Sequence, residues 1–123
     1  MPLVDVTHDR SVTDIELRQL AECLPDLVAA AVDCPDEPWV GSPALGDIEI
    51  RFRSKGDYDV GQLRLVIEVR TKRFASRVVD QQRRADVLRE RLEGLGYEQI
   101  GVWLMLVEGA WSQSAVGDFA PGT

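Results

Sequence analysis

Residues 63–70 read LRLVIEVR, and this stretch decides the fold because its side chains alternate in character. The apolar positions are Leu63, Leu65, Ile67 and Val69, and the positions between them are Arg64, Val66, Glu68 and Arg70. A period of two places alternate residues on opposite faces of a β-strand. The stretch therefore predicts a strand with one buried face.

Three further strands are predicted, two before this one in the sequence and one after it. Residues 48–53 read IEIRFR, with Ile48, Ile50 and Phe52 on one face of a half-buried strand. The segment from Pro2 to Thr7 places Val4 and Val6 on one side. Residues 100–107 are nearly all apolar, which predicts a strand buried on both faces.

Two helices are predicted between these strands. Thr13 and Glu16 have the spacing of a capping box, so a helix should begin there, with Pro25 bending it. Its apolar stripe consists of Leu17, Leu20, Leu24, Leu27, Val28 and Ala31. A second helix is predicted from a Ser76 cap to about Gly94. Its inward-facing residues are expected to be Val78, Ala85, Leu88, Leu92 and Leu95.

The order of these elements is strand, helix, strand, repeated once. We expect one domain over residues 1–123, with similar halves at 2–54 and 61–108 and a tail at 112–123. Two βαβ units predict an α+β fold, in which a four-stranded mixed sheet carries both helices on one face. The other face would be bare and would carry Trp103 and Met105. Because a monomer rarely leaves a whole sheet face uncovered, we expect a homo-oligomer.

The composition narrows the function classes. The chain is 45% hydrophobic and 28% charged, with a formal net charge of -7, which indicates a folded protein and disfavours a nucleic-acid binder. No apolar run is long enough to span a membrane, and the first residues lack the pattern of a secretory signal, so a cytoplasmic protein is expected. His8 is the only histidine and has no ligand cluster at metal-binding spacing, so no metal is expected.

The best candidate for chemistry is Pro2, directly after Met1. Removal of the methionine would leave a secondary amine at the start of a strand. An ordinary α-amino group has a pKa of about 7.7–8.0, and desolvation or nearby cations lower that pKa. A neutral amine at cell pH can act as a general base. In the alternative interpretation, Pro2 only begins an edge strand, where its missing N–H costs nothing.

Several features together resemble the tautomerase superfamily, with its MIF-like fold, and within it most of all the 5-carboxymethyl-2-hydroxymuconate isomerase group. They are the opening Met-Pro-Leu-Val-Asp-Val, Pro25 within the first helix, a long proline-containing loop before the second strand, and the segment from Leu65 to Leu88. The resemblance spans nearly the whole chain at the level of architecture, and Pro2 is the residue that it places firmly.

The resemblance implies a homotrimer with active sites between subunits. It also implies a keto–enol isomerase of aromatic-compound catabolism that needs no cofactor, in which Pro2 moves a proton on a small anionic carboxylate substrate. Arginines would bind the carboxylate, since a guanidinium pairs with it through two hydrogen bonds. Arg73 is the first choice and Arg77 the alternative, and Arg51 and Arg53 lie on the polar side of their strand.

Two other functions remain open on the same fold. One is a dehalogenase, hydratase or decarboxylase of small unsaturated acids, which would need a carboxylate such as Glu49 or Glu108 near Pro2. The other is a non-catalytic trimeric binding protein that retains Met1, because an acylated ring nitrogen has no useful basicity.

Overall fold

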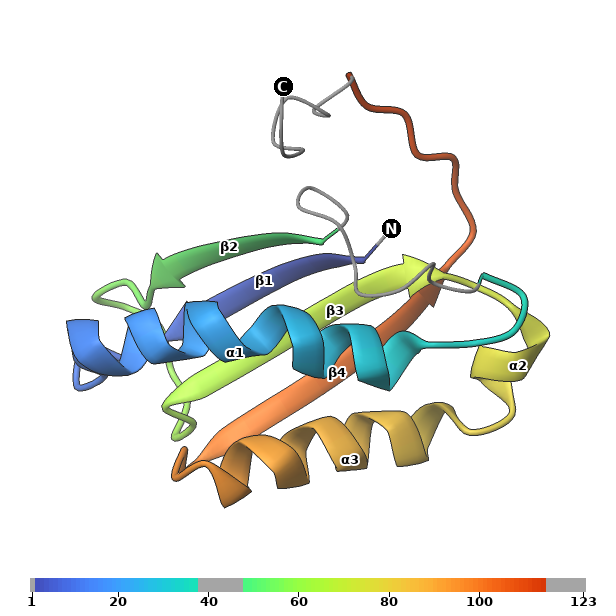
Figure 1. The fold of residues 1–123 in the computed structure, drawn as a ribbon. Coiled ribbons are helices and arrows are strands. Elements are labelled where there is room, and N and C mark those ends of the chain that lie inside the picture. The colour runs from blue at the N-terminus through green and yellow to red at the C-terminus, as the bar shows by residue number, and fades with distance from the viewer. Residues whose placement is uncertain (1, 38–47, 115–123) are drawn as a thin grey trace, which may run out of the picture.

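The computed structural model describes residues 2–37 and 48–114 (Figure 1). Trp39, which the sequence places in a loop, and most of the predicted tail lie outside the described residues. The elements are β1 (Leu3–His8), α1 (Asp14–Val32), β2 (Glu49–Ser54), β3 (Leu65–Lys72), α2 (Ala75–Val78), α3 (Gln81–Gly94) and β4 (Ile100–Val107). His8, the histidine considered above, is the last residue of β1.

The strands form one mixed sheet in the order β2-β1-β3-β4. β1 is parallel to β2, β3 is parallel to β4, and β1 is antiparallel to β3. Both long helices lie on the same side of the sheet (Figure 1). The predicted α+β fold of two βαβ units is therefore confirmed.

The core lies between the sheet and the two long helices. Val4 and Val6 of β1 and Ile67 and Val69 of β3 are fully buried, as the alternating pattern predicts. They belong to one cluster with residues of α1 and α3, namely Leu20, Leu24, Val28, Leu88 and Leu92. The apolar stripes of the two long helices thus cover one face of the sheet, which includes the even-numbered positions of β1.

α1 begins where the capping box predicts. The Glu16 amide donates a 3.2 Å hydrogen bond to the Thr13 hydroxyl, and the Thr13 amide donates one of 3.1 Å to the Glu16 carboxylate. The helix continues as one element across Pro25 to Val32.

The prediction of a single helix from Ser76 to Gly94 is wrong, because the chain forms α2, breaks at Val79 and Asp80, and then forms α3. Ser76 does not cap a helix, since its hydroxyl donates a 2.5 Å hydrogen bond to the Asp36 carboxylate. Asp80 holds the position before α3, and its carboxylate accepts hydrogen bonds from the side chains of Arg83 and Arg84. The sequence prediction crossed this break because Val78 and Ala85, seven residues apart, have the spacing of one helix face.

Two residues that the single helix would bury are exposed. Val78 ends the separate α2 and Leu95 follows the last residue of α3, so neither lies on the buried stripe of α3.

The second face of the sheet is bare, as the sequence predicts. Cross-strand register aligns Arg51, Asp5, Glu68 and Trp103 in one row, and Glu49, Leu3, Arg70 and Met105 in the next. Trp103 is 64% exposed. The expectation that residues 100–107 are buried on both faces is therefore wrong for the single chain, because no described element covers this side of β4.

Candidate functional site

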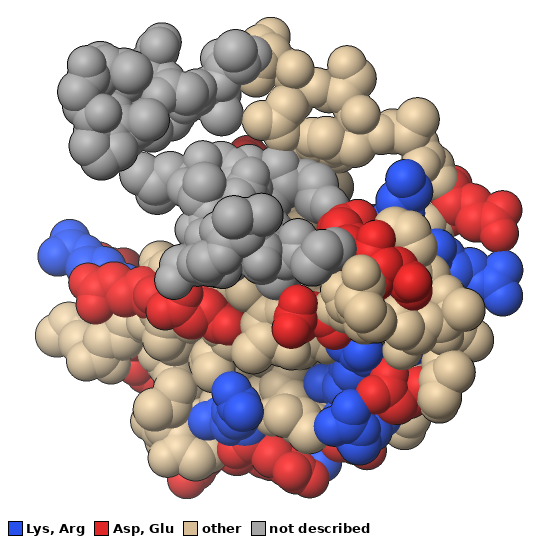
Figure 2. All heavy atoms as spheres, turned by 45° about the vertical axis from the view of Figure 1, so that its right-hand side comes forward, with Lys and Arg blue, Asp and Glu red and all other residues tan. Residues whose placement is uncertain are grey.

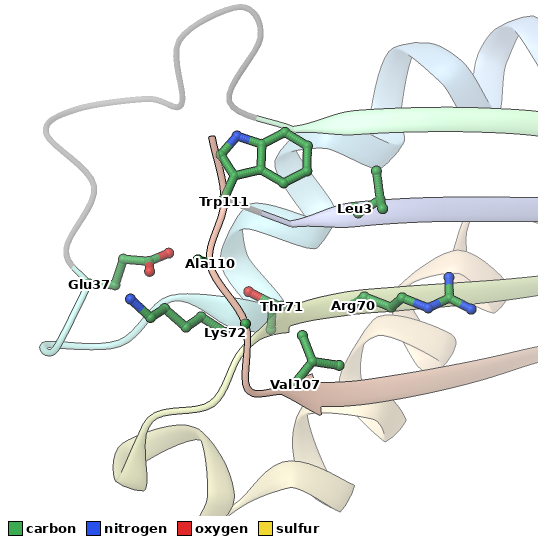
Figure 3. A pocket seen from close by; sticks show the side chains of 9 residues that line it. Leu3, Glu37, Arg70, Thr71, Lys72, Val107, Ala110 and Trp111 are labelled. Atoms are coloured by element: carbon green, nitrogen blue, oxygen red, sulfur yellow. The ribbon is translucent and has the colours of Figure 1, made fainter. Parts of the chain in front are cut away.

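A cavity of about 330 Å³ lies at the end of the sheet where β1 begins and β3 ends (Figure 3). Its apolar wall includes Leu3, Val107 and Trp111, and its polar lining includes Arg70, Thr71, Lys72 and Glu37. We call it the strand-end cavity. Its size suits a small ligand, since binding sites commonly enclose about 300–1,000 Å³.

Pro2 lies next to this cavity without lining it. Pro2 is buried, and its carbonyl oxygen accepts a 3.3 Å hydrogen bond from the Glu49 amide. The antiparallel register pairs Leu3 with Arg70, so one further step places Pro2 opposite Thr71. Residues directly opposite in this way are close neighbours on one face of a sheet. With Met1 attached, the ring nitrogen of Pro2 is an amide without basicity.

Arg70 is held on the bare face, at the edge of the cavity. One terminal nitrogen of its guanidinium donates a 2.8 Å hydrogen bond to Asp5, and the other donates one of 3.1 Å to Glu68. Two carboxylates therefore compensate its charge, and its side chain is about one third exposed, at 36%. Arg70 is thus oriented before any ligand binds.

Lys72 supplies a second cation at the last residue of β3. Its ammonium lies 5.6 Å from the centre of the Phe74 ring, within the range of a cation–π interaction. In Figure 3, the Lys72 amino group extends to the same side of the cavity as Glu37. Arg70 and Lys72 therefore flank Thr71 along the strand.

Arg51 and Arg53 do not line the strand-end cavity. Both project from β2 on the bare face and are more than half exposed. Arg51 lies 3.9 Å from Glu49, and Arg53 lies 4.0 Å from Asp5. In a single chain, these two arginines are therefore surface groups.

Arg73 lies directly beyond β3 and faces a separate, open hollow of about 440 Å³ with Val78 and Val79. Its guanidinium donates a 3.2 Å hydrogen bond to Glu108, and its side chain is 54% exposed. Arg73, which the sequence analysis ranks first for carboxylate binding, is thus two residues from Thr71 but does not line the cavity nearest to Pro2.

Arg77 has a different role from the one that the sequence predicted. Its side chain is completely buried, and its guanidinium donates hydrogen bonds to the carbonyl oxygens of Val32 (2.7 Å) and Lys72 (2.9 Å) and to the Glu37 carboxylate (3.4 Å). All three guanidinium nitrogens are thus engaged by groups of the chain itself. Arg77 is therefore a structural residue of the single chain.

Sequence reasoning missed Thr71, Glu37 and Trp111 as cavity residues. Thr71 follows Leu65, Ile67 and Val69 on the buried face of β3 and is the polar member of that series. This departure from the apolar pattern is the signal that could have identified it. Glu37 and Trp111 reach the cavity through long-range packing, which carries no local signal.

The surface carries charges of both signs. In the view of Figure 2, basic and acidic side chains lie side by side. Ion pairs on the surface include that of Arg89 with Glu93, whose side-chain atoms lie 2.5 Å apart. Among the described residues, no group of three or more His, Cys, Asp or Glu side chains could hold a metal ion. The described helices include none that is both long and apolar enough to cross a membrane.

The sheet consists of two parallel pairs, β1 with β2 and β3 with β4, which meet antiparallel at β1 and β3, and both long helices lie on one face. This is the arrangement of the tautomerase fold. The chain has this fold, because solved structures of tautomerase-superfamily proteins match nearly its whole length. A 5-carboxymethyl-2-hydroxymuconate isomerase from Deinococcus radiodurans R1 is 14% identical, with 95% of this chain and 92% of that chain covered at a TM-score of 0.60.

Two further structures have the same fold. A fused 4-OT symmetric trimer is 16% identical over 93% of this chain and 92% of its own, at a TM-score of 0.59. FG41 malonate semialdehyde decarboxylase, inhibited by 3-bromopropiolate, is 15% identical over 96% and 98%, at a TM-score of 0.57. No family model matches the sequence, and the curated proteins include no match either.

Proposed function

We propose that this chain is a cofactor-independent tautomerase that moves a proton on a small keto or enol carboxylic acid, with the freed nitrogen of Pro2 as the base. The observation that carries the proposal is the position of Pro2, buried opposite Thr71 and adjacent to a cavity flanked by two cations. The isomerase and the 4-OT trimer that share this fold support it.

The chemistry follows from charge and burial. A neutral secondary amine accepts the proton of the substrate enol, and the resulting ammonium returns a proton to a substrate carbon. Arg70 and Lys72 border the cavity and place positive charge where the dienolate would form. Burial favours the neutral form of an amine, which keeps Pro2 competent as a base.

Arg73, Arg51 and Arg53 stay in the proposal as carboxylate-binding residues. None of them lines the strand-end cavity of its own chain, so their role requires a second subunit. We therefore propose a homotrimer in which the bare sheet faces pack together and bring these arginines to a neighbouring chain's site. The trimer that shares the fold supports this assembly.

The test measures ketonisation of a 2-hydroxy-2,4-dienoate by ultraviolet absorbance, after intact mass spectrometry has shown whether Met1 is removed. The processed wild type should catalyse the reaction, and Pro2→Ala should lose about 100-fold or more, which is the usual contribution of a general base. A chain that retains Met1 and binds the acid without turnover would instead identify a non-catalytic binding protein.

Glu37 favours a second candidate, a hydratase or decarboxylase of small unsaturated acids. Glu37 lines the strand-end cavity and its side chain is 30% exposed, whereas Glu49 and Glu108, the candidates from the sequence, do not line it. A carboxylate there would activate water next to Pro2. Product analysis with malonate semialdehyde or 3-haloacrylates distinguishes the two, since release of carbon dioxide or halide would replace tautomerisation as the main activity.

A further inference from the structure

Thr71 presents an unpartnered hydroxyl to the strand-end cavity. The residue is 1% exposed, and its Oγ1 has no hydrogen-bond partner among the described residues. Figure 3 shows the hydroxyl directed into the space between the end of the sheet and the segment that carries Trp111. A buried hydroxyl without a partner costs free energy, and valine would fit the same strand position without that cost. The hydroxyl therefore requires a reason other than packing.

The polar side chains that line the cavity differ in whether they can donate or accept hydrogen bonds. Arg70 and Lys72 can only donate, and an ionised Glu37 can only accept. The Thr71 hydroxyl can do both. During tautomerisation, the oxygen on the carbon next to the carboxylate changes from an enol, which donates a hydrogen bond, to a ketone, which accepts one. Among the described polar side chains that line the cavity, Thr71 carries the group that can accept a hydrogen bond from the enol and donate one to the ketone.

We infer that Thr71 Oγ1 binds the 2-oxygen of the substrate, so that the site selects 2-oxo and 2-hydroxy-2-enoic acids over acids that lack this oxygen. The position of Thr71 opposite Pro2 fits this role, since it brings the changing oxygen beside the proposed base. The enol proton passes from that oxygen to the amine, and the ketone oxygen then accepts the hydrogen bond of the hydroxyl. This inference rests on the proposed function and names its substrate class.

The test compares the binding of 2-oxopentanoate and of pentanoate, which differ by the 2-oxygen alone. Calorimetry should show at least tenfold tighter binding of 2-oxopentanoate to the wild type. Thr71→Val should remove most of this preference and leave pentanoate binding within about twofold, and Thr71→Ser should keep the preference. In the absence of ligand, Thr71→Val should melt at the same or a higher temperature, because an unpartnered hydroxyl is removed.

An unchanged preference in Thr71→Val would overturn the inference, as would a wild type that binds neither acid or binds both equally. A lower melting temperature for Thr71→Val would show a structural role instead. Binding requires no turnover, so the two proposals can fail separately. If Pro2 proves inactive and the 2-oxygen preference still depends on the hydroxyl, the tautomerase proposal fails and the assignment of Thr71 stands.

Discussion

The Arg77 guanidinium donates a 2.7 Å hydrogen bond to the carbonyl oxygen of Val32, the last residue of α1. α1 has no basic residue in its own last turn, and its C-terminal carbonyl groups carry partial negative charge. Arg84 lies at the same helix end and donates to the carbonyl oxygens of Ala31 (2.9 Å) and Asp33 (2.6 Å). Two arginines that come more than 40 residues after α1 thus donate hydrogen bonds to the carbonyl groups at its end.

We expect Arg77→Met to lower the free energy of unfolding by about 3 kcal/mol, because it leaves buried carbonyl groups and a carboxylate without their partner. Urea titration measures this loss. Arg83→Met serves as a control, since Arg83 is 68% exposed and makes a surface pair. Equal stabilities for the two variants would contradict a structural role for Arg77.

Arg73→Ala should reduce kcat/KM more for dicarboxylates than for monocarboxylates, because we propose that its guanidinium forms a clamp of two parallel hydrogen bonds on the second carboxylate. Steady-state kinetics on matched substrates measure the two losses. Arg10→Ala provides the control, because Arg10 also forms an exposed ion pair, with Asp57, but comes after the opposite end of β1. Equal losses on both substrate classes would argue against the clamp.

The bare sheet face should be the interface between subunits. Trp103→Lys should convert a trimer to monomers, because an unpaired charge is costly in an apolar contact. The introduced amine can pair with Glu68 in the same row, so the single chain should stay folded. Sedimentation velocity measures the change. Val60→Lys, at a 99% exposed position between β2 and β3, should leave the assembly unchanged. A wild type that sediments as a monomer would refute this interface.

Stability in acid should depend on Asp80. Hydrogen bonds from the Arg84 and Arg83 side chains hold the pKa of Asp80 below its ordinary value of 3.8. A lowered pKa in the folded state stabilises the fold above pH 3.8, and this contribution disappears as the pH falls through the folded-state pKa. Asp80→Asn should therefore lose stability at pH 6 and show a smaller decline between about pH 5 and 2.

Chemical denaturation across this pH range measures the effect, and Asp26→Asn, at an exposed position of α1, controls for the loss of one negative charge. If the two variants declined equally toward low pH, Asp80 would not have the role assigned to it.

The fold could be predicted because its signals are local. The alternation at residues 65–70 and the Thr13 capping box each operate within a few residues, and both are confirmed, whereas Leu63 lies before β3 and is exposed. The break at Asp80 and the burial of Arg77 could not be predicted, since both depend on contacts with the end of α1, more than 40 residues earlier. The sequence also could not show that Thr71 faces position 2, because that register belongs to two strands far apart in the chain.

The most direct test of the account uses one sequence in two forms, which differ only at the nitrogen of Pro2. A cleavable N-terminal extension leaves this nitrogen an amide, and its removal leaves a free secondary amine. We predict that the cleaved form ketonises a 2-hydroxy-2,4-dienoate at least about 100-fold faster than the extended form, with an acid limb in its pH–rate profile below the ordinary α-amino pKa of about 7.7–8.0. Equal rates for two folded forms of the same assembly would contradict the claim that Pro2 is the base.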